Sequence, residues 1–184
     1  LAEEGIPAYS VSREGYFETY EVSVLLDYLK VLDNARQDLP LTAVLTSPFA
    51  GLTAAELSVI RLSYPNQLFY EAVEGFFSLS PEEIPETVDK KQAIQTQEKL
   101  RKFFEVLEHF RAILPYTAIH DLLAEIIDKT GYGLFISAMP GGAQRQANVE
   151  MLVEKARAFE GTSYKGLFNF VRYIEQLKKY DVDY

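Results

Sequence analysis

The sequence contains no cysteine and no tryptophan, and the residue types and patterns that it lacks exclude several classes of function. Without cysteine the chain cannot form a disulfide or a thiolate metal site, which fits a reducing compartment such as the cytoplasm. It also has no run of about eighteen apolar residues, the length that a transmembrane helix needs. We therefore expect a cytoplasmic location and no membrane partner.

The common signatures of catalytic sites are also missing. The sequence has no Gly-x4-Gly-Lys-Ser/Thr phosphate loop, no Gly-x-Ser-x-Gly elbow and no carboxylate cluster of the nuclease type. Its two histidines, His109 and His120, lack the spacing of a His-Glu-x-x-His zinc site, and we interpret both as structural. The sequence predicts no catalytic residue, no metal site and no cofactor in this chain.

Positive charge is scarce, and it is unevenly distributed. The 184 residues carry a net charge of −9, which argues against a freestanding nucleic-acid-binding protein. Residues 1–100 hold 7 Lys/Arg against 16 Asp/Glu, whereas residues 139–184 hold 7 against 6. Because phosphates are attracted only where the local potential is positive, any surface that faces DNA should draw on the later part of the chain.

What the sequence does contain is helical periodicity over most of its length. Apolar residues recur every three or four positions, and the connections between these segments are short. A short apolar segment at residues 8–11 is the only candidate strand. We predict a mainly all-α fold with at most that one strand, and helices near residues 17–34, 41–45, 53–62, 68–77, 89–114, 117–131, 134–138, 143–159 and 163–180.

Three helix starts are predicted from local capping patterns. Thr53-Ala54-Ala55-Glu56 has the form of a capping box, in which Thr and Glu side chains each bind the other residue's amide. Ser80-Pro81-Glu82-Glu83 combines a capping Ser, a Pro at the first helical position and a Glu three residues on. Thr117 is expected to cap the helix that follows Pro115.

Two segments are candidate phosphate-binding sites. Ser47, Gly51 and Thr53 lie in a loop that leads into a helix, and helix N-termini present free N–H groups to anions. Gly141-Gly142 also precedes a helix, and Arg145 adds a charge in its first turn. The alternatives are an ordinary turn for the first segment and, for the second, a helix held to a neighbouring loop by Arg145 and Asn148.

A third candidate surface consists of the basic residues of the last two predicted helices. These residues could flank a duplex or a partner subunit, or they could form a solvated helix face. They are Lys155, Arg157, Lys165, Arg172, Lys178 and Lys179.

An ordered string of motifs resembles one region of known DNA helicases. The string is Gly5-Ile6-Pro7, Tyr16-Phe17-Glu18, Glu21-Val22, Tyr28 to Asn34 with Asp38, and later Gly141-Gly142 followed by Gln144-Arg145 and Asn148. It resembles subdomain 2B of superfamily 1 helicases of the UvrD and PcrA type, and above all the AddA (RexA) family of bacterial helicase–nucleases. The resemblance implies that residues 1–14 end the second motor domain and that 15–184 form helical subdomain 2B.

The resemblance also implies a functional context. ATP and Mg would act in the parent protein, a helicase–exonuclease of double-strand break repair and recombination, and not in this chain. The implied partners are duplex DNA, the rest of the parent helicase and an AddB/RexB-like second subunit. Ser47 to Thr53 lie where UvrD-type helicases have a duplex-contacting loop, but Ala50 replaces its arginine and Thr53 its second glycine. Because the first residue is Leu1, we expect an excised domain.

The sequence leaves two functions open. The first is a regulatory domain that contacts DNA or the partner subunit. The alternative is a protein–protein interaction module with no direct DNA contact, which the net charge of −9 and the missing arginine at Ala50 favour.

Overall fold

The computed structural model describes residues 15–179, and this part of the chain is helical with no strand. The predicted all-α class is therefore confirmed, whereas the candidate strand at 8–11 and the predicted boundary after residue 14 lie outside the described residues. The elements are η1 (Tyr16–Glu18), α1 (Tyr20–Asp33), α2 (Asp38–Thr46), α3 (Ala54–Ser63), α4 (Phe69–Ser78), α5 (Lys90–Ile113), η2 (Leu114–Tyr116), α6 (Ile119–Lys129), α7 (Tyr132–Ser137), α8 (Gly142–Glu160) and α9 (Leu167–Lys179).

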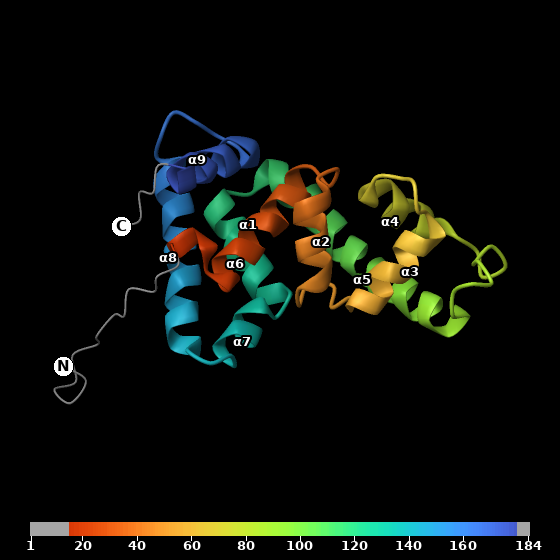
Figure 1. Ribbon diagram of the computed structural model, residues 1–184. Helices are drawn as coiled ribbons and strands as arrows, with labels where there is room; N and C mark the ends of the chain where they lie inside the picture. The colour runs from red at the N-terminus through yellow and green to blue at the C-terminus, as the bar shows by residue number, and fades with distance from the viewer. Residues whose placement is uncertain (1–14, 180–184) are drawn as a thin grey trace.

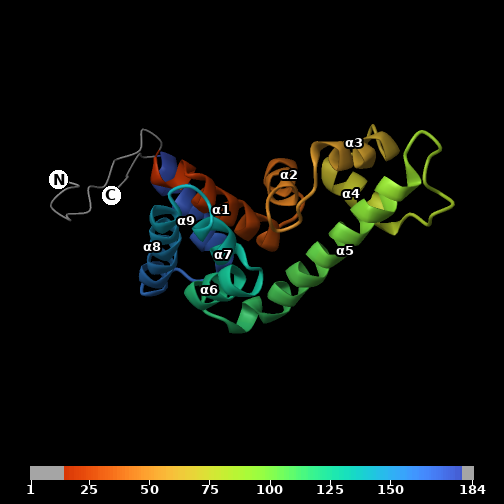
Figure 2. The ribbon, with the colours of Figure 1, turned by 90° about the horizontal axis from the view of Figure 1, so that it is seen from below.

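The helices form two groups joined by the long helix α5 (Figures 1 and 2). Helix α1 lies at the centre of the larger group and packs against α2, α8 and α9, while α6, α7 and α8 pack on one another. Helices α3 and α4 pack together and against the first half of α5, at the far end of the molecule. With 24 residues, α5 is about 36 Å long, enough to extend from one group to the other.

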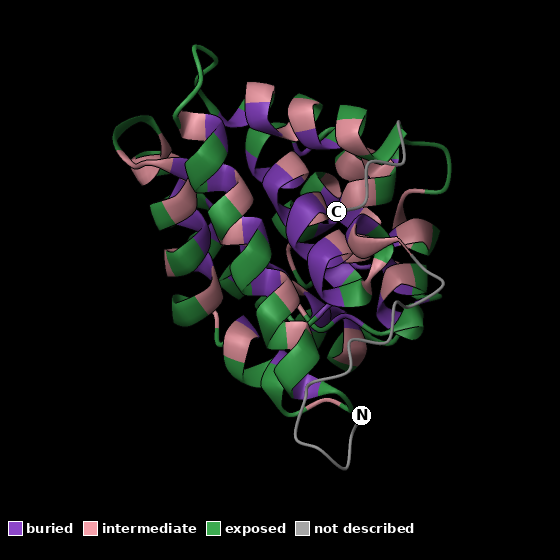
Figure 3. Cartoon of the chain, turned by 90° about the vertical axis from the view of Figure 1, so that its left-hand side faces the viewer, coloured by how far each residue is buried: buried purple, intermediate pink, exposed green. Residues whose placement is uncertain are grey.

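Helix α1 is buried on more than one side because it has neighbours all around it. The predicted apolar stripe of Val22, Leu25, Leu26, Leu29 and Leu32 is buried, and the helix ends at Asn34 as predicted. Val24, Tyr28 and Val31 are buried as well. Figure 3 shows the same pattern over the whole bundle, with buried residues on the inner faces of the helices and exposed residues outside.

The Tyr28 hydroxyl is the one buried side-chain polar atom in the described part of the chain without a hydrogen-bond partner. Its ring is 1% exposed and lies among the rings of Phe49, Phe103 and Phe110. Since an unpaired buried hydroxyl is costly, we expect Tyr28→Phe to raise the free energy of unfolding by about 1 kcal/mol. Urea denaturation followed by circular dichroism measures this, and a loss of stability in the variant would contradict it.

Helix α5 starts and ends as predicted, but the prediction that Ile94 belongs to its buried apolar face is wrong. Asp89 caps the helix by accepting hydrogen bonds from the amides of Lys91 and Gln92, at 2.8 and 3.4 Å. Leu100, Phe103, Leu107 and Phe110 are buried, whereas Ile94 is 50% exposed. The inward positions in this part of α5 belong to Ala93 and Thr96, where the helix packs against α3 and α4.

Two of the predicted helix starts are wrong. Ser80 to Glu83 form a single turn, closed by the Glu83 carboxylate on the Ser80 amide at 2.9 Å, and Pro85 follows too soon for a helix. Thr117 does not cap α6, because its hydroxyl bonds the Ile113 carbonyl at 2.9 Å. The cap comes from Glu160 at the end of α8, whose carboxylate accepts from the amides of Ile119 and His120 at 2.6 and 3.4 Å.

The turn between α7 and α8 requires glycine at Gly142. A Cβ atom added there would lie 2.0 Å from the Ser137 carbonyl oxygen, which is backbone and cannot move aside. We expect Gly142→Ala to lower the free energy of unfolding by about 2 kcal/mol, because the two helices would have to separate. Thermal denaturation measures this. Gly161→Ala is the milder comparison, since its Cβ would lie 3.2 Å from the Ala158 carbonyl oxygen and would require a shift of only a few tenths of an ångström.

Candidate functional site

The loop from Ser47 to Thr53 connects α2 to α3 and is held together by its own backbone. Ser47 is 3% exposed, and its hydroxyl donates to the Val44 carbonyl at 2.6 Å. Its carbonyl accepts from the Gly51 amide at 2.7 Å, and Gly51 has a φ of +66°, which glycine adopts without strain. Ser47 therefore shapes the loop from inside, while Gly51 and Thr53 are exposed.

The predicted capping box at the start of α3 is confirmed. The Thr53 hydroxyl accepts from the Glu56 amide at 3.2 Å, and the Glu56 carboxylate accepts from the Thr53 amide at 2.7 Å. These bonds fix the loop at the entrance to the helix. They also occupy the Thr53 hydroxyl, which reduces what it can offer to a ligand.

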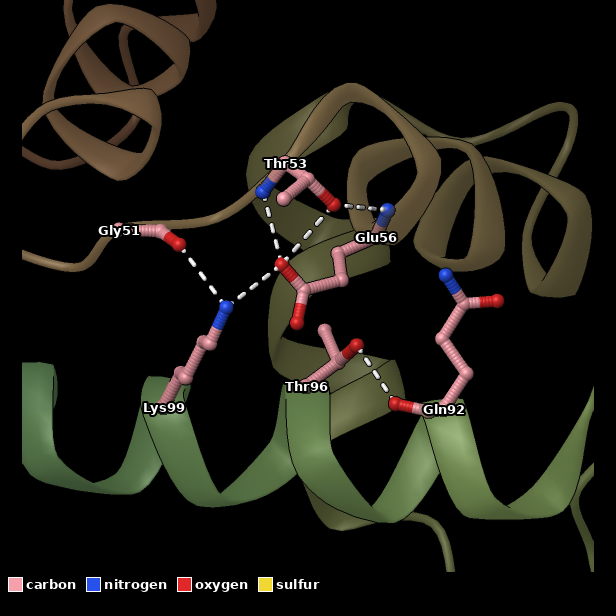
Figure 4. A network of polar contacts seen from close by, with 6 residues as sticks. All are labelled: Gly51, Thr53, Glu56, Gln92, Thr96 and Lys99. Atoms are coloured by element: carbon pink, nitrogen blue, oxygen red, sulfur yellow. Dashed lines mark hydrogen bonds and ion pairs between the residues drawn. The ribbon is translucent and has the colours of Figure 1, made fainter.

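Lys99 of α5 completes this network, and sequence reasoning missed it (Figure 4). Its ammonium group donates to the Gly51 carbonyl and to the Glu56 carboxylate, both at 2.9 Å. Burial raises the pKa of Glu56, but hydrogen bonds from Lys99 and Thr53 outweigh burial and hold that pKa below its ordinary value. The loop thus carries one partly exposed cation, largely neutralised by a buried carboxylate.

Arg145, the other predicted contact residue, belongs to a second network between α8 and α1. Its guanidinium lies 2.5 Å from one carboxylate oxygen of Glu21, and Asn148 donates to the other oxygen at 2.7 Å. Glu21 is 2% exposed. Burial raises the pKa of Glu21, yet the hydrogen bonds from Asn148 and Arg145 lower it below its ordinary value. Arg145 and Asn148 thus hold the helix to another element, as the alternative expected, but that element is helix α1 and not a neighbouring loop.

The two networks are linked through aromatic rings. Phe49 in the loop stacks on Tyr132 with ring centroids 4.8 Å apart, and Tyr132 donates to the Glu21 carbonyl at 3.0 Å. Within residues 15–179, no hydrogen bond joins Arg145 to Ser47, Gly51 or Thr53. The four predicted contact residues therefore belong to two linked networks: Ser47, Gly51 and Thr53 lie in the loop, and Arg145 is held by Glu21.

The basic residues of the last two helices are spread over different surfaces. On α8, Lys155 lies over the rings of Tyr16 and Phe17, and Arg157 pairs with Glu154 at 3.2 Å. On α9, Arg172 lies over the Phe168 ring, and Lys178 and Lys179 end the helix. Lys165 lies just before α9 and bonds the Glu160 carbonyl. Lys165, Arg172 and Lys179 lie on the side of α9 opposite its buried residues, whereas Lys178 lies toward Asp27 of α1.

A groove of about 900 Å³ lies between α6, α7 and α8. Its walls are mainly apolar, with Ile127, Ile136 and Val149 among them, and Leu134 at its edge is 78% exposed. Among its lining residues, all within the described part of the chain, the charged ones are acidic: Asp128, Glu150 and Glu154. The groove has the character of a surface for a protein segment rather than for a phosphate.

The histidines take part in helix contacts. The His120 ring bonds the Glu160 carboxylate that caps α6, and His109 lies 3.7 Å from Glu125. Over residues 15–179, no three His, Cys, Asp or Glu side chains gather as metal ligands would. None of the helices described is long and apolar enough to cross a bilayer.

Comparison with known proteins identifies relatives over nearly the whole chain. No family model matches it. A protein of Lachnoclostridium phytofermentans, named as the AddA subunit of an ATP-dependent helicase/nuclease, is 40% identical over 218 residues, covering 100% of the chain and 16% of the relative. Proteins of the same name from Oceanobacillus iheyensis and Bacillus licheniformis are 39% and 41% identical, covering 97% and 96% of the chain and 14% of each relative.

These matches, together with the fold, define the class of protein. The described part of the chain is an all-α domain, and it corresponds to a segment of a helicase/nuclease subunit. The chain belongs to the AddA family of ATP-dependent helicase/nuclease subunits, which confirms the resemblance stated from the motifs. It spans 14–16% of the length of these relatives.

Proposed function

We propose that the chain is an accessory, regulatory domain of an ATP-dependent DNA helicase–exonuclease that acts in double-strand break repair and recombination. The observation that supports this is the 39–41% identity to AddA helicase/nuclease proteins over nearly all of the chain. In this proposal residues 15–184 are helical subdomain 2B, residues 1–14 end the neighbouring motor domain, and the protein acts in the cytoplasm. ATP and Mg are bound by other parts of the parent protein.

The loop between α2 and α3 is the proposed duplex contact. Gly51 and Thr53 are exposed, as are Ala54 and Ala55 in the first turn of α3, and Lys99 supplies one cation. Ser47 and Arg145 act indirectly, since Ser47 shapes the loop and Arg145 is paired with Glu21. One partly neutralised lysine provides a weak contact, so the domain would position duplex DNA rather than hold it tightly.

This contact predicts weak, salt-sensitive duplex binding that depends on Lys99. Fluorescence anisotropy with a labelled DNA duplex should show that Lys99→Gln reduces the slope of log K against log salt concentration by about 1. Lys102→Gln, on an exposed face of α5, is the control. Absence of duplex binding at every salt concentration would contradict a direct DNA contact.

The alternative function is a protein–protein module with no DNA contact, in which an AddB/RexB-like second subunit or the rest of the helicase is the partner. The groove between α6, α7 and α8 favours this alternative, because its apolar walls and acidic residues suit a protein segment. Retained affinity for the second subunit without any duplex binding would favour it over the DNA-contacting domain.

The proposal also predicts that the isolated chain does not hydrolyse ATP. The sequence has no phosphate loop of the Gly-x4-Gly-Lys-Ser/Thr type, which the parent's motor would need. A coupled ATPase assay with single-stranded DNA and Mg measures this. Turnover that follows the chain through purification, and that is absent from a mock preparation, would contradict the proposal.

A further inference from the structure

The outer face of α9 is unlike the rest of this acidic chain. Leu167, Phe170 and Ile174 are buried, so the residues opposite them on the helix face outward. The outward residues follow helical spacing from the turn that precedes α9. They are Lys165, Phe168, Asn169, Arg172, Gln176 and Lys179.

This face is positively charged even though the whole chain carries −9. Its outward residues include three Lys/Arg, and the one Asp/Glu of residues 161–179 is Glu175. Glu175 lies 3.4 Å from Lys30 of α1, and the Glu160 carboxylate is occupied by the start of α6. Within residues 15–179 these two carboxylates are thus engaged, and Arg172 and Lys179 are exposed to solvent.

Large aromatic rings lie exposed among these charges. Tyr164 is 69% exposed and Phe168 is 55% exposed. The Arg172 guanidinium carbon lies 5.6 Å from the centre of the Phe168 ring. An exposed ring next to an arginine contributes little to folding, but it is a suitable stacking surface for a planar, anionic ligand.

A recess of about 310 Å³ lies beside this face. The rings of Phe159, Tyr164 and Tyr173 line it together with Asn169, Arg172 and Gln176. Phe159 is 4% exposed and supports the half-buried Tyr173 from behind, with ring centroids 5.3 Å apart, so Tyr164 and Tyr173 supply the accessible aromatic surface. Flat rings stack with a base, side-chain amides bind its polar edge, and a guanidinium binds the adjoining phosphate.

We propose that the outer face of α9 binds unpaired nucleotides of a nucleic-acid strand, with one base in the recess and a phosphate on Arg172. This inference rests on the proposed function, since it assumes that the chain works next to DNA, and it adds a site separate from the loop between α2 and α3. Base stacking gives the exposed rings of Tyr164 and Phe168 a role. A contact with the phosphate backbone of a duplex alone would give them none.

The test is fluorescence anisotropy of the 184-residue chain with labelled oligo(dT) of about twelve nucleotides, a length within the range of single-strand sites. Phe168→Ala and Tyr164→Ala should each weaken binding at least about 5-fold, the lower end of the effect of removing one stacking ring. Arg172→Gln should weaken binding and reduce its salt dependence. Phe77→Ala is the matched control, because Phe77 is 39% exposed and belongs to α4, which lies at the opposite end of the molecule from α9.

The same variants separate this inference from the proposed function. Because Phe168 and Tyr164 are exposed, their replacement should leave the thermal midpoint unchanged. Wild-type chain that binds duplex but not oligo(dT) would overturn the inference while leaving the loop contact intact. Oligo(dT) binding that is unaffected by Phe168→Ala and Tyr164→Ala would overturn it as well, whereas binding of neither probe would contradict both proposals.

Discussion

Replacing Glu21 with alanine should lower the free energy of unfolding by about 3 kcal/mol, because it breaks a largely buried ion pair. Glu21 is 2% exposed and accepts from Arg145 at 2.5 Å and from Asn148 at 2.7 Å. Without the carboxylate, both donors at the junction of α1 and α8 lose their partner. Urea denaturation followed by circular dichroism measures the loss.

The control for this variant is Glu18→Ala. Glu18 lies three residues away on η1 and is exposed, so its replacement should change stability by less than about 0.5 kcal/mol. Equal effects of the two substitutions would show that the Glu21 network does not hold α8 to α1. Asn148→Ala should give an intermediate loss, since it removes one of the two donors.

The same network predicts how stability depends on pH. The pKa of Glu21 is lower in the folded chain than in the unfolded chain, so the folded state binds its proton more weakly. The stabilisation from the ionised Glu21 carboxylate is fully present above the pKa of about 4.3 that Glu has in the unfolded chain. It is lost as the pH falls through the lower pKa of Glu21 in the folded chain. The difference in stability between wild type and Glu21→Gln should therefore narrow below about pH 4, as measured by denaturation over a pH series.

Helix boundaries were predictable where a local signal determines them. The Thr53 capping box, the Asp89 cap and the end of α1 at Asn34 each depend on residues within four positions of the boundary. Apolar spacing likewise predicted the buried stripe of α1. Such signals act through short-range hydrogen bonds and helix geometry, which the sequence specifies directly.

The polar partnerships could not be predicted, because they join elements that are far apart in the chain. Lys99 meets Glu56 across 43 residues, and Glu160 caps α6 across 41. Thr117 has the local pattern of a helix cap, but the carboxylate of Glu160 from another helix caps α6 instead. Similarly, a Gly-Gly turn followed by Arg145 is compatible with two outcomes, an anion site or an internal ion pair, and the sequence does not distinguish them. In the structure Arg145 forms the internal ion pair, with Glu21.

The division of the fold into two groups leads to the second large prediction. Phe76 on α4 is fully buried where α3 and α4 pack against the first half of α5, and Phe76→Ala should cost about 4 kcal/mol. Few contacts join these helices to the other group besides α5 and the junction of α2 with α4, where Asp38 accepts from the amides of Phe69 and Tyr70 at 3.0 and 3.3 Å. This loss should therefore fall mainly on α3, α4 and the start of α5. Hydrogen exchange measured by mass spectrometry should show faster exchange there, with α1 and α8 unchanged.

Phe77→Ala is the matched control on the same helix. Phe77 is 39% exposed and touches Phe104 with ring centroids 5.6 Å apart, so its replacement should cost only about 1 kcal/mol. If Phe76→Ala instead accelerates exchange equally in all helices, the two groups unfold as one unit, and α5 transmits stability along its whole length. Selective exchange of α3 and α4 would instead mean that the proposed duplex-contacting loop adjoins the less stable group, where small ligand-induced shifts cost least.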